Sequence, residues 1–304
     1  MTDSTCEILG KYQIRKTGKQ KNAFIEYMRG VTDGMGYELK VESGALGAKN
    51  LVVGDVSRAK VVYSAHYDTA PVLPFPNFIT PKNFGIYLLY NAALVLGFVV
   101  IALLIGFACD MLALGSTVSL RAVQITYVLL LVMLLAGPAN KHTANDNTSG
   151  VTLLLDVMRE LPADKRADVA FVFFDLEEAG LLGSMAFAKA HKTQMKNKLL
   201  VNFDCVSDGN HMLFMLRKGA RGKKIAFESA FASADGIEVE VVEKGTFYPS
   251  DQANFNGGVG VAALNSTKSG LLYMGRIHTA RDVIYNEQNI EFLKDGAIRL
   301  LELI

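Results

Sequence analysis

Residues 168–180 read DVAFVFFDLEEAG, and residues 60–68 read KVVYSAHYD. In each stretch a short apolar run stops abruptly and is followed by acidic residues or a histidine. A short uninterrupted apolar run is typical of a strand that is buried on both faces of a sheet. We therefore predict two inner strands whose carboxyl ends carry polar side chains.

The segments around these two strands alternate between predicted strands and predicted helices. Further strands are expected at 37–41, 51–53 and 199–203, and helices at 19–29, 148–161, 181–191 and 289–303. Such alternation favours an α/β fold of three layers, with a mixed, mostly parallel sheet and helices on both faces. Ligands of such sheets bind beyond the carboxyl ends of the strands, which is where the polar clusters of this chain fall.

Residues 84–137 differ in composition from the rest of the chain. Of these 54 residues, 41 are apolar and only Asp110 and Arg121 are charged, whereas 20% of the whole chain is charged. About 20 apolar residues cross the hydrocarbon core of a bilayer, so residues 84–108 and 118–137 are predicted to form a transmembrane helical hairpin. The alternative is a helix pair buried in a dimer interface. One discontinuous domain, residues 1–83 and 138–304, would thus be interrupted by an inserted hairpin at 84–137.

The residues that flank the hairpin indicate its orientation. A hairpin returns the chain to its starting side, so both parts of the discontinuous domain are expected on one side of the membrane. Lys82 and Lys141 flank the hairpin on that side, and positive residues favour the cytoplasm. We therefore expect a two-span membrane protein with a cytoplasmic domain. Residues 70–83 contain four prolines and are expected to form a stiff connector at the membrane surface.

Charge and cysteine content exclude several functional classes. The chain has 31 Lys and Arg against 30 Asp and Glu, so no basic field for nucleic acid is expected. Its three scattered cysteines form neither a disulfide framework nor a CxxC metal knuckle. The polar amino-terminal segment lacks the apolar core of a signal peptide.

Most of the plausible metal ligands lie in five short patches. These are SAHYD (64–68), NDNTSG (145–150), DLEEAG (175–180), NFD (202–204) and IHT (277–279). Carboxylates and imidazoles are suitable ligands for a pair of divalent metal ions. Because so many acidic groups at one sheet edge would repel one another without cations, the patches together predict a metal centre.

The series HYD, NDNTSG, EEAGLLGS, FD and IHT resembles the co-catalytic di-zinc aminopeptidase family. That family also includes glutamate carboxypeptidases, glutaminyl cyclases and the transferrin-receptor ectodomain. The resemblance extends over nearly the whole chain outside the insertion and implies a fold of the zinc-exopeptidase type. It implies two zinc ions, or other divalent ions in their place, held by His66 and Asp204, by Glu178 and His278, and by Asp146 as the bridge between them.

The resemblance also implies roles for residues near the metal ions. Glu177 would be the general base that activates a metal-bridging water, and Asp68 would orient a histidine ligand. Asp251 would lie near the substrate. In several family members a tyrosine directly before the last histidine stabilises the oxyanion; here Ile277 occupies that position, which leaves Tyr248 as a candidate donor.

The expected function is a membrane-anchored zinc aminopeptidase that removes residues from peptides with a free amino terminus. The alternatives are a glutaminyl-cyclase-like acyl transferase and a catalytically inactive receptor or scaffold homologue. The cyclases usually have a Trp-lined pocket, and this chain has no Trp. An inactive homologue predicts lost ligands, whereas no ligand is missing here. Because the hairpin follows soon after His66, it is also expected to hold the mouth of the site near the bilayer and to favour hydrophobic peptides.

Overall fold

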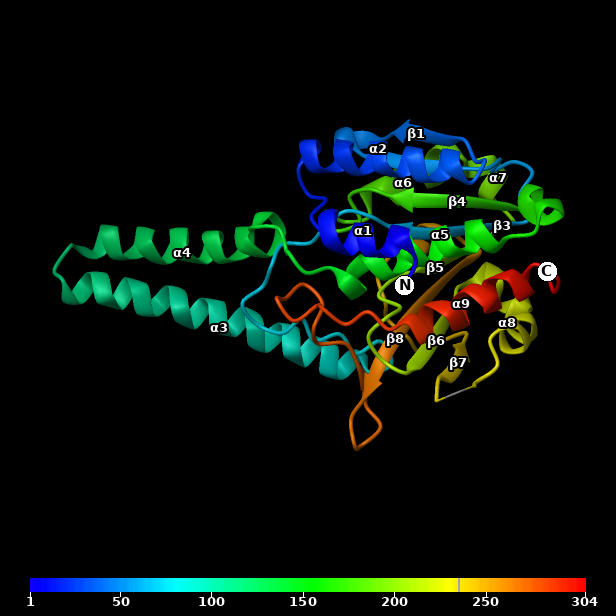
Figure 1. The fold of residues 1–304 in the computed structure, drawn as a ribbon. Helices are drawn as coiled ribbons and strands as arrows, with labels where there is room; N and C mark the ends of the chain where they lie inside the picture. Colours follow the sequence, from blue (N-terminus) through cyan, green and yellow to red (C-terminus); the bar gives the residue numbers. More distant parts are fainter. Residues whose placement is uncertain (235) are drawn as a thin grey trace.

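The computed structural model describes residues 1–234 and 236–304, and these form a three-layer α/β fold (Figure 1). In the described residues nine strands form one mixed sheet, in the order β1-β2-β4-β3-β5-β8-β6-β7, with β9 paired to β8. The strands are β1 (Leu39–Ser43), β2 (Lys49–Val53), β3 (Val61–His66), β4 (Val169–Phe174), β5 (Leu199–Phe203), β6 (His211–Leu216), β7 (Glu238–Val242), β8 (Gly258–Ser266) and β9 (Leu272–Tyr273).

The centre of the sheet is parallel and its margins are mixed. Strands β4, β3, β5 and β8 run parallel to one another, whereas β2 is antiparallel to β4 and β6 is antiparallel to β8. All residues of β3 and β4 are buried, as their apolar runs predict. His66 pairs with Phe174 in the register, so the polar residues that follow β4 begin beside the end of β3. The prediction of a mixed sheet is confirmed, and the parallel pairs are concentrated at its centre.

Helices cover both faces of the sheet, as predicted. The helices in the described residues are α1 (Asp3–Lys11), α2 (Gly18–Gly34), α3 (Phe84–Met111), α4 (Ser116–Ala136), α5 (Gly150–Glu160), α6 (Leu182–Ala190), α7 (Lys192–Met195), α8 (Lys224–Ala230) and α9 (Glu287–Leu300). Helices α1, α2, α5, α8 and α9 pack on one face, and α6 covers the other. Local signals set the helix ends: Thr17 and Gln20 form a capping box at the start of α2, and Pro162 follows the end of α5.

Helices α3 and α4 form an antiparallel hairpin that projects from the sheet edge at which the parallel strands end (Figure 1). Both helices are long and apolar enough to cross a membrane, and only 17% of the most apolar stretch of α3 and 6% of that of α4 is buried. The predicted bounds, 84–108 and 118–137, are corrected to 84–111 and 116–136. The turn is shorter than predicted because α3 continues to Met111 and α4 begins at Ser116. The Ser119 hydroxyl donates a hydrogen bond to the Asp110 carboxylate across the tip of the hairpin.

The first turns of α3 pack on the α/β domain before the helix meets α4. The Phe84 and Tyr87 rings lie 5.1 and 5.4 Å from that of Phe247, between ring centroids. An ion pair of 2.5 Å between Lys82 and Glu240 lies in the same region. The preceding residues 70–83, all described, contain no helix and only two isolated bridges, as their prolines predict.

Candidate metal centre

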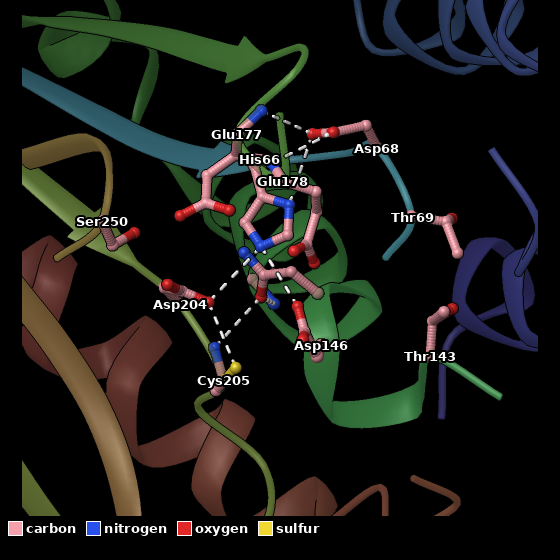
Figure 2. A network of polar contacts seen from close by, with 12 residues as sticks. His66, Asp68, Thr69, Thr143, Asp146, Glu177, Glu178, Asp204, Cys205 and Ser250 are labelled. Atoms are coloured by element: carbon pink, nitrogen blue, oxygen red, sulfur yellow. Dashed lines mark hydrogen bonds and ion pairs between the residues drawn. The ribbon is translucent and has the colours of Figure 1, made fainter. Parts of the chain in front are cut away.

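Strand ends and the loops beside them bring the predicted ligands together. His66 is the last residue of β3, and Asp204 directly follows β5. Glu177 and Glu178 lie in the loop between β4 and α6, while Asp146 lies in an irregular turn of residues 144–149 before α5. His278 comes from the loop between β9 and α9. Figure 2 shows His66, Asp146, Asp204 and the adjacent Glu177 and Glu178 directed at one point.

Asp146 lies between the two histidines. Its Oδ1 is 3.2 Å from His66 Nε2, and its Oδ2 is 2.9 Å from His278 Nε2. His66 Nε2 is also 3.4 Å from Asp204 Oδ1, and His278 Nε2 is 3.3 Å from Glu178 Oε2. The two oxygens of one carboxylate therefore face two separate clusters, as a bridging ligand requires.

The donor atoms fit a pair of divalent cations. Within each cluster, His66–Asp146–Asp204 and Asp146–Glu178–His278, one ligand atom per residue lies within 4.8 Å of the others. Glu178 Oε1 is buried without a hydrogen-bond partner, which is costly unless a cation compensates. Imidazole nitrogen and carboxylate oxygen are ligands that zinc accepts.

The charge of the cluster perturbs its own titration. Burial by itself would lower the pKa of His66, but the Glu177 charge and the Asp146 and Asp204 carboxylates raise it well above the usual range. Burial raises the pKa of Glu177 well above its ordinary value, and the nearby Glu178 charge adds to that rise. The centre thus contains more negative charge than its own side chains neutralise, which favours cation binding.

Asp68 holds the loop that carries the paired glutamates. Its two oxygens accept hydrogen bonds from the backbone N–H groups of Glu177, at 3.0 Å, and Glu178, at 3.3 Å. Its Oδ1 also lies 3.6 Å from His66 Nδ1, on the side that the predicted orienting role requires. The closer contacts are those to the glutamate backbone, a role that the sequence analysis did not include (Figure 2).

Three polar side chains fix the turn that carries Asp146. Asp282 accepts hydrogen bonds from the backbone N–H groups of Asn145, at 2.8 Å, and Asp146, at 3.1 Å. The Asn145 side-chain oxygen accepts backbone hydrogen bonds from residues 207 and 208. Asn147 binds the backbone on both sides of Asp204, at Phe203 O and Cys205 N. The NDN sequence therefore supplies one candidate ligand between two residues that tie its turn to the end of β5.

Arg15 is a buried residue behind the centre that the sequence analysis did not select. Its side chain is fully buried and donates hydrogen bonds to the Tyr67 carbonyl and, at 3.2 Å, to Thr148 Oγ1. Tyr67 directly follows His66, and Thr148 lies in the turn that carries Asp146. Burial lowers the pKa of Arg15 to about 10, although nearby carboxylates oppose the shift. Nothing in the local sequence distinguishes Arg15 from a surface arginine.

The two candidate substrate contacts, Tyr248 and Asp251, lie in different surroundings. The Tyr248 hydroxyl donates a hydrogen bond to the backbone carbonyl of Asp204, 3.3 Å away, and the residue lines the cavity beside the centre. Asp251 is completely buried, and burial raises its pKa to about 7. Asp251 therefore belongs to the interior beside the centre, whereas Tyr248 reaches the cavity itself.

The cavity beside the centre has a volume of about 680 Å³. Its charged wall consists of His66, Asp146, Glu177, Glu178, Asp204 and His278. Its apolar wall includes Ile79, Leu181 and Ile277, together with Tyr87 from α3 and Leu135 from α4. The contribution of the hairpin to this wall was not predicted, because no local pattern shows that residues in spanning helices meet a loop far along the chain.

The fold and the clustered histidines and carboxylates are those of a zinc-dependent peptidase or a closely related enzyme. The model of peptidase family M28 matches residues 127–297, more than half of the chain, and the chain belongs to this family. The predicted resemblance to the co-catalytic zinc aminopeptidases is thereby confirmed.

Solved structures show the same fold at low sequence identity. The LapA aminopeptidase of Legionella pneumophila aligns with a TM-score of 0.57 and 13% identity over 98% of this chain and 67% of its own. Glutaminyl cyclase of Porphyromonas gingivalis aligns with a TM-score of 0.60 and 15% identity over 99% and 97%. Glutaminyl cyclase of Macrostomum lignano aligns with a TM-score of 0.56 and 13% identity over 100% of this chain and 88% of its own. The comparison with curated protein sequences found no match. At these identities the structures establish the fold alone.

Proposed function

We propose that this protein is a zinc-dependent aminopeptidase that the α3–α4 hairpin anchors in a membrane. One observation carries the enzymatic part: Asp146 divides its two oxygens between two histidine–carboxylate clusters, and the Glu177 carboxylate lies beside them. A site built to hold a single ion would not need the second cluster. Family M28 membership supports a peptidase and thus a peptide substrate.

The proposed metal ligands divide into two sets. His66 and Asp204 would hold one zinc ion, Glu178 and His278 the other, and Asp146 both. When bound, the two ions would polarise the scissile carbonyl and make water a stronger nucleophile. Residues of the chain then position the reactants and move the proton.

Glu177 is the proposed general base. It would take a proton from the attacking water and deliver it to the leaving amine. Burial raises its pKa, and a carboxylate with a raised pKa is a stronger proton acceptor. Asp68 fixes its backbone, so the carboxylate remains directed at the cavity. The acidic wall would also attract the free amino terminus of a peptide. Tyr248 is the candidate donor to the oxyanion, for which its hydroxyl would have to turn from the Asp204 carbonyl.

The catalytic part of the proposal is tested with the full-length protein in detergent. We expect two zinc ions per chain by elemental analysis and hydrolysis of aminoacyl-nitroanilides that a chelator abolishes and added zinc restores. An inactive receptor or scaffold homologue would show no hydrolysis at any zinc concentration. The structural similarity to glutaminyl cyclases over 97% of the bacterial chain makes cyclisation of amino-terminal glutamine the second activity to assay. Cyclisation without aminoacyl hydrolysis would replace the peptidase assignment.

The membrane part of the proposal has two tests. An integral hairpin predicts that the protein stays with membranes in alkaline carbonate, whereas a helix pair buried between two soluble copies predicts release. The cysteines then report sidedness, because Cys6 is exposed on the α/β domain and Cys109 lies near the tip of the hairpin. A cytoplasmic domain predicts that an impermeant maleimide labels Cys6 only from the cytoplasmic side. Labelling of Cys6 from the opposite side would reverse the orientation.

A further inference from the structure

Both helices of the hairpin, α3 and α4, contribute side chains to the wall of the cavity at the candidate metal centre. Tyr87 lies in the first turn of α3 and Leu135 lies one residue before the end of α4, and both line the cavity. They stand in the same apolar wall as Ile277, which directly precedes the candidate ligand His278. The segment that distinguishes this chain by its composition is therefore also part of its proposed substrate pocket.

The root of α3 is held firmly against the α/β domain. The Tyr87 ring packs on Phe247, whose neighbour Tyr248 also lines the cavity. The Phe247 backbone N–H donates a hydrogen bond of 2.8 Å to the carbonyl of Pro81, just before α3 begins. Because backbone and aromatic contacts both connect this helix to the cavity wall, the position of Tyr87 relative to the metal centre is fixed.

Leu135 connects the cavity to the outer surface of the hairpin. Its side chain is 74% exposed although the residue lines the cavity. Exposed apolar residues such as Leu129 and Val132 continue from it along α4. A continuous apolar surface of this kind marks contact with a membrane or a partner. The rim of the cavity and the proposed membrane-facing surface thus meet at one residue.

We propose that the hairpin is a specificity element as well as an anchor, an inference that rests on the proposed aminopeptidase function. The cavity receives the large apolar side chain of the amino-terminal residue of a peptide that lies at the bilayer surface. Tyr87 and Leu135 form the outer part of the wall that this side chain contacts, and the acidic wall opposite attracts the free amine. The peptide enters over the rim at Leu135, from the membrane interface.

The first experiment measures the preference between two substrates in nanodiscs. Wild-type protein and the Leu135→Ala variant are compared on leucyl- and alanyl-nitroanilide. Because a shortened wall loses more contact with a long side chain than with a short one, we expect the leucyl-to-alanyl ratio of kcat/KM to fall about fivefold. The matched control is Leu129→Ala, which removes an exposed leucine from the same helix away from the cavity. An unchanged ratio in Leu135→Ala, or an equal change in both variants, overturns the inference.

A binding measurement separates this inference from the proposed function. Calorimetry of the zinc-loaded proteins with leucine hydroxamate and alanine hydroxamate requires no turnover. Loss of leucine selectivity in Leu135→Ala, without hydrolysis by the wild type, would support the pocket and contradict the peptidase. Hydrolysis with unchanged binding selectivity would support the peptidase and contradict the pocket.

Entry from the bilayer is tested with a leucyl peptide that carries a carboxyl-terminal acyl anchor. The peptide is placed either in the vesicles that contain the protein or in separate vesicles at the same total concentration. Entry over the rim predicts cleavage at least about tenfold faster in the shared vesicles, because the membrane raises the effective concentration of the peptide. The free peptide without the anchor provides the reference rate. Equal rates in the two arrangements overturn the route, and faster cleavage in the shared vesicles supports it.

Discussion

The metal centre and the hairpin are positioned by different physical means. At the sheet edge, each candidate ligand follows a buried strand or a turn whose backbone is held by hydrogen bonds, such as those of Asp68 and Asp282. The hairpin instead consists of two apolar helices that pack on each other and on a few aromatic rings at the root of α3. Hydrogen bonds therefore fix the positions of the polar side chains at the sheet edge, whereas the position of the hairpin depends on side-chain packing and on its surroundings.

This difference predicts that single substitutions have unequal effects in the two regions. Removal of one polar atom at the sheet edge leaves buried charges without compensation, which is costly. Removal of one methyl group from an exposed face of the hairpin changes the free energy of unfolding little if lipid surrounds that face. Substitutions at both places test whether the chemistry is confined to the first region.

The largest effect is expected for Asp146→Asn. The amide retains the size of the side chain but loses one oxygen and the negative charge that two clusters share. We expect zinc content to fall below two ions per chain and kcat/KM to fall by a factor on the order of 10³ or more, because the metal ions supply most of the electrostatic stabilisation. Elemental analysis and nitroanilide hydrolysis measure the two effects. The exposed Asp164→Asn is the control, and retention of both ions with full activity would remove Asp146 from the centre.

Glu177→Gln is expected to separate proton transfer from metal binding. The amide cannot accept the proton of the attacking water, so kcat should fall by a factor of about 10²–10⁴. Zinc content should remain at the wild-type value because the two clusters that share Asp146 do not include Glu177. Full activity in this variant would show that another group acts as the base, whereas loss of zinc would make Glu177 a ligand.

The strand ends of the metal centre were accessible to sequence analysis for a simple reason. A run such as VAFVFF has to be buried on both faces, and the polar residues after it must then lie at the sheet edge. The hairpin was accessible through composition, and its helix ends were predicted to within three residues. These two signals are local, so neither depends on knowing how distant segments meet.

The parts that escaped prediction depend on contacts between distant segments. Arg15 is buried where the segment between α1 and α2 meets Tyr67, after β3, and Thr148, before α5. Tyr87 and Leu135 reach the cavity only because α3 docks beside Phe247. Asp68 could be identified as a neighbour of His66, but its bonds to the glutamate backbone follow from the parallel pairing of β3 and β4.

Arg15→Met should have an effect on stability rather than on chemistry. The substitution preserves part of the apolar volume but leaves the Tyr67 carbonyl without its side-chain donor and removes one of the partners of the Thr148 hydroxyl. We expect a loss of about 2–4 kcal/mol in the free energy of unfolding, because buried acceptors without a partner are costly. Chemical denaturation in detergent measures it, with Arg15→Lys as the charge-preserving comparison. A loss below about 0.5 kcal/mol would place the guanidinium in a solvated site.

The smallest effect on catalysis is expected for Gly106→Leu in α3. A Cβ atom at Gly106 would lie 2.4 Å from Val123 Cγ2 and 3.3 Å from the Ser119 carbonyl, so a larger side chain must push the two helices apart. Overpacking of this kind costs about 1–3 kcal/mol. The hairpin should therefore become easier to cleave with protease in detergent, while zinc content and hydrolysis of soluble aminoacyl-nitroanilides stay within about twofold of the wild type, a margin of roughly 0.4 kcal/mol. The matched control is Gly97→Leu in the same helix, where a Cβ atom meets nothing within 4 Å. Loss of zinc in Gly106→Leu but not in Gly97→Leu would mean that helix spacing far from the root is transmitted to the metal centre, and the division between the two regions would not hold.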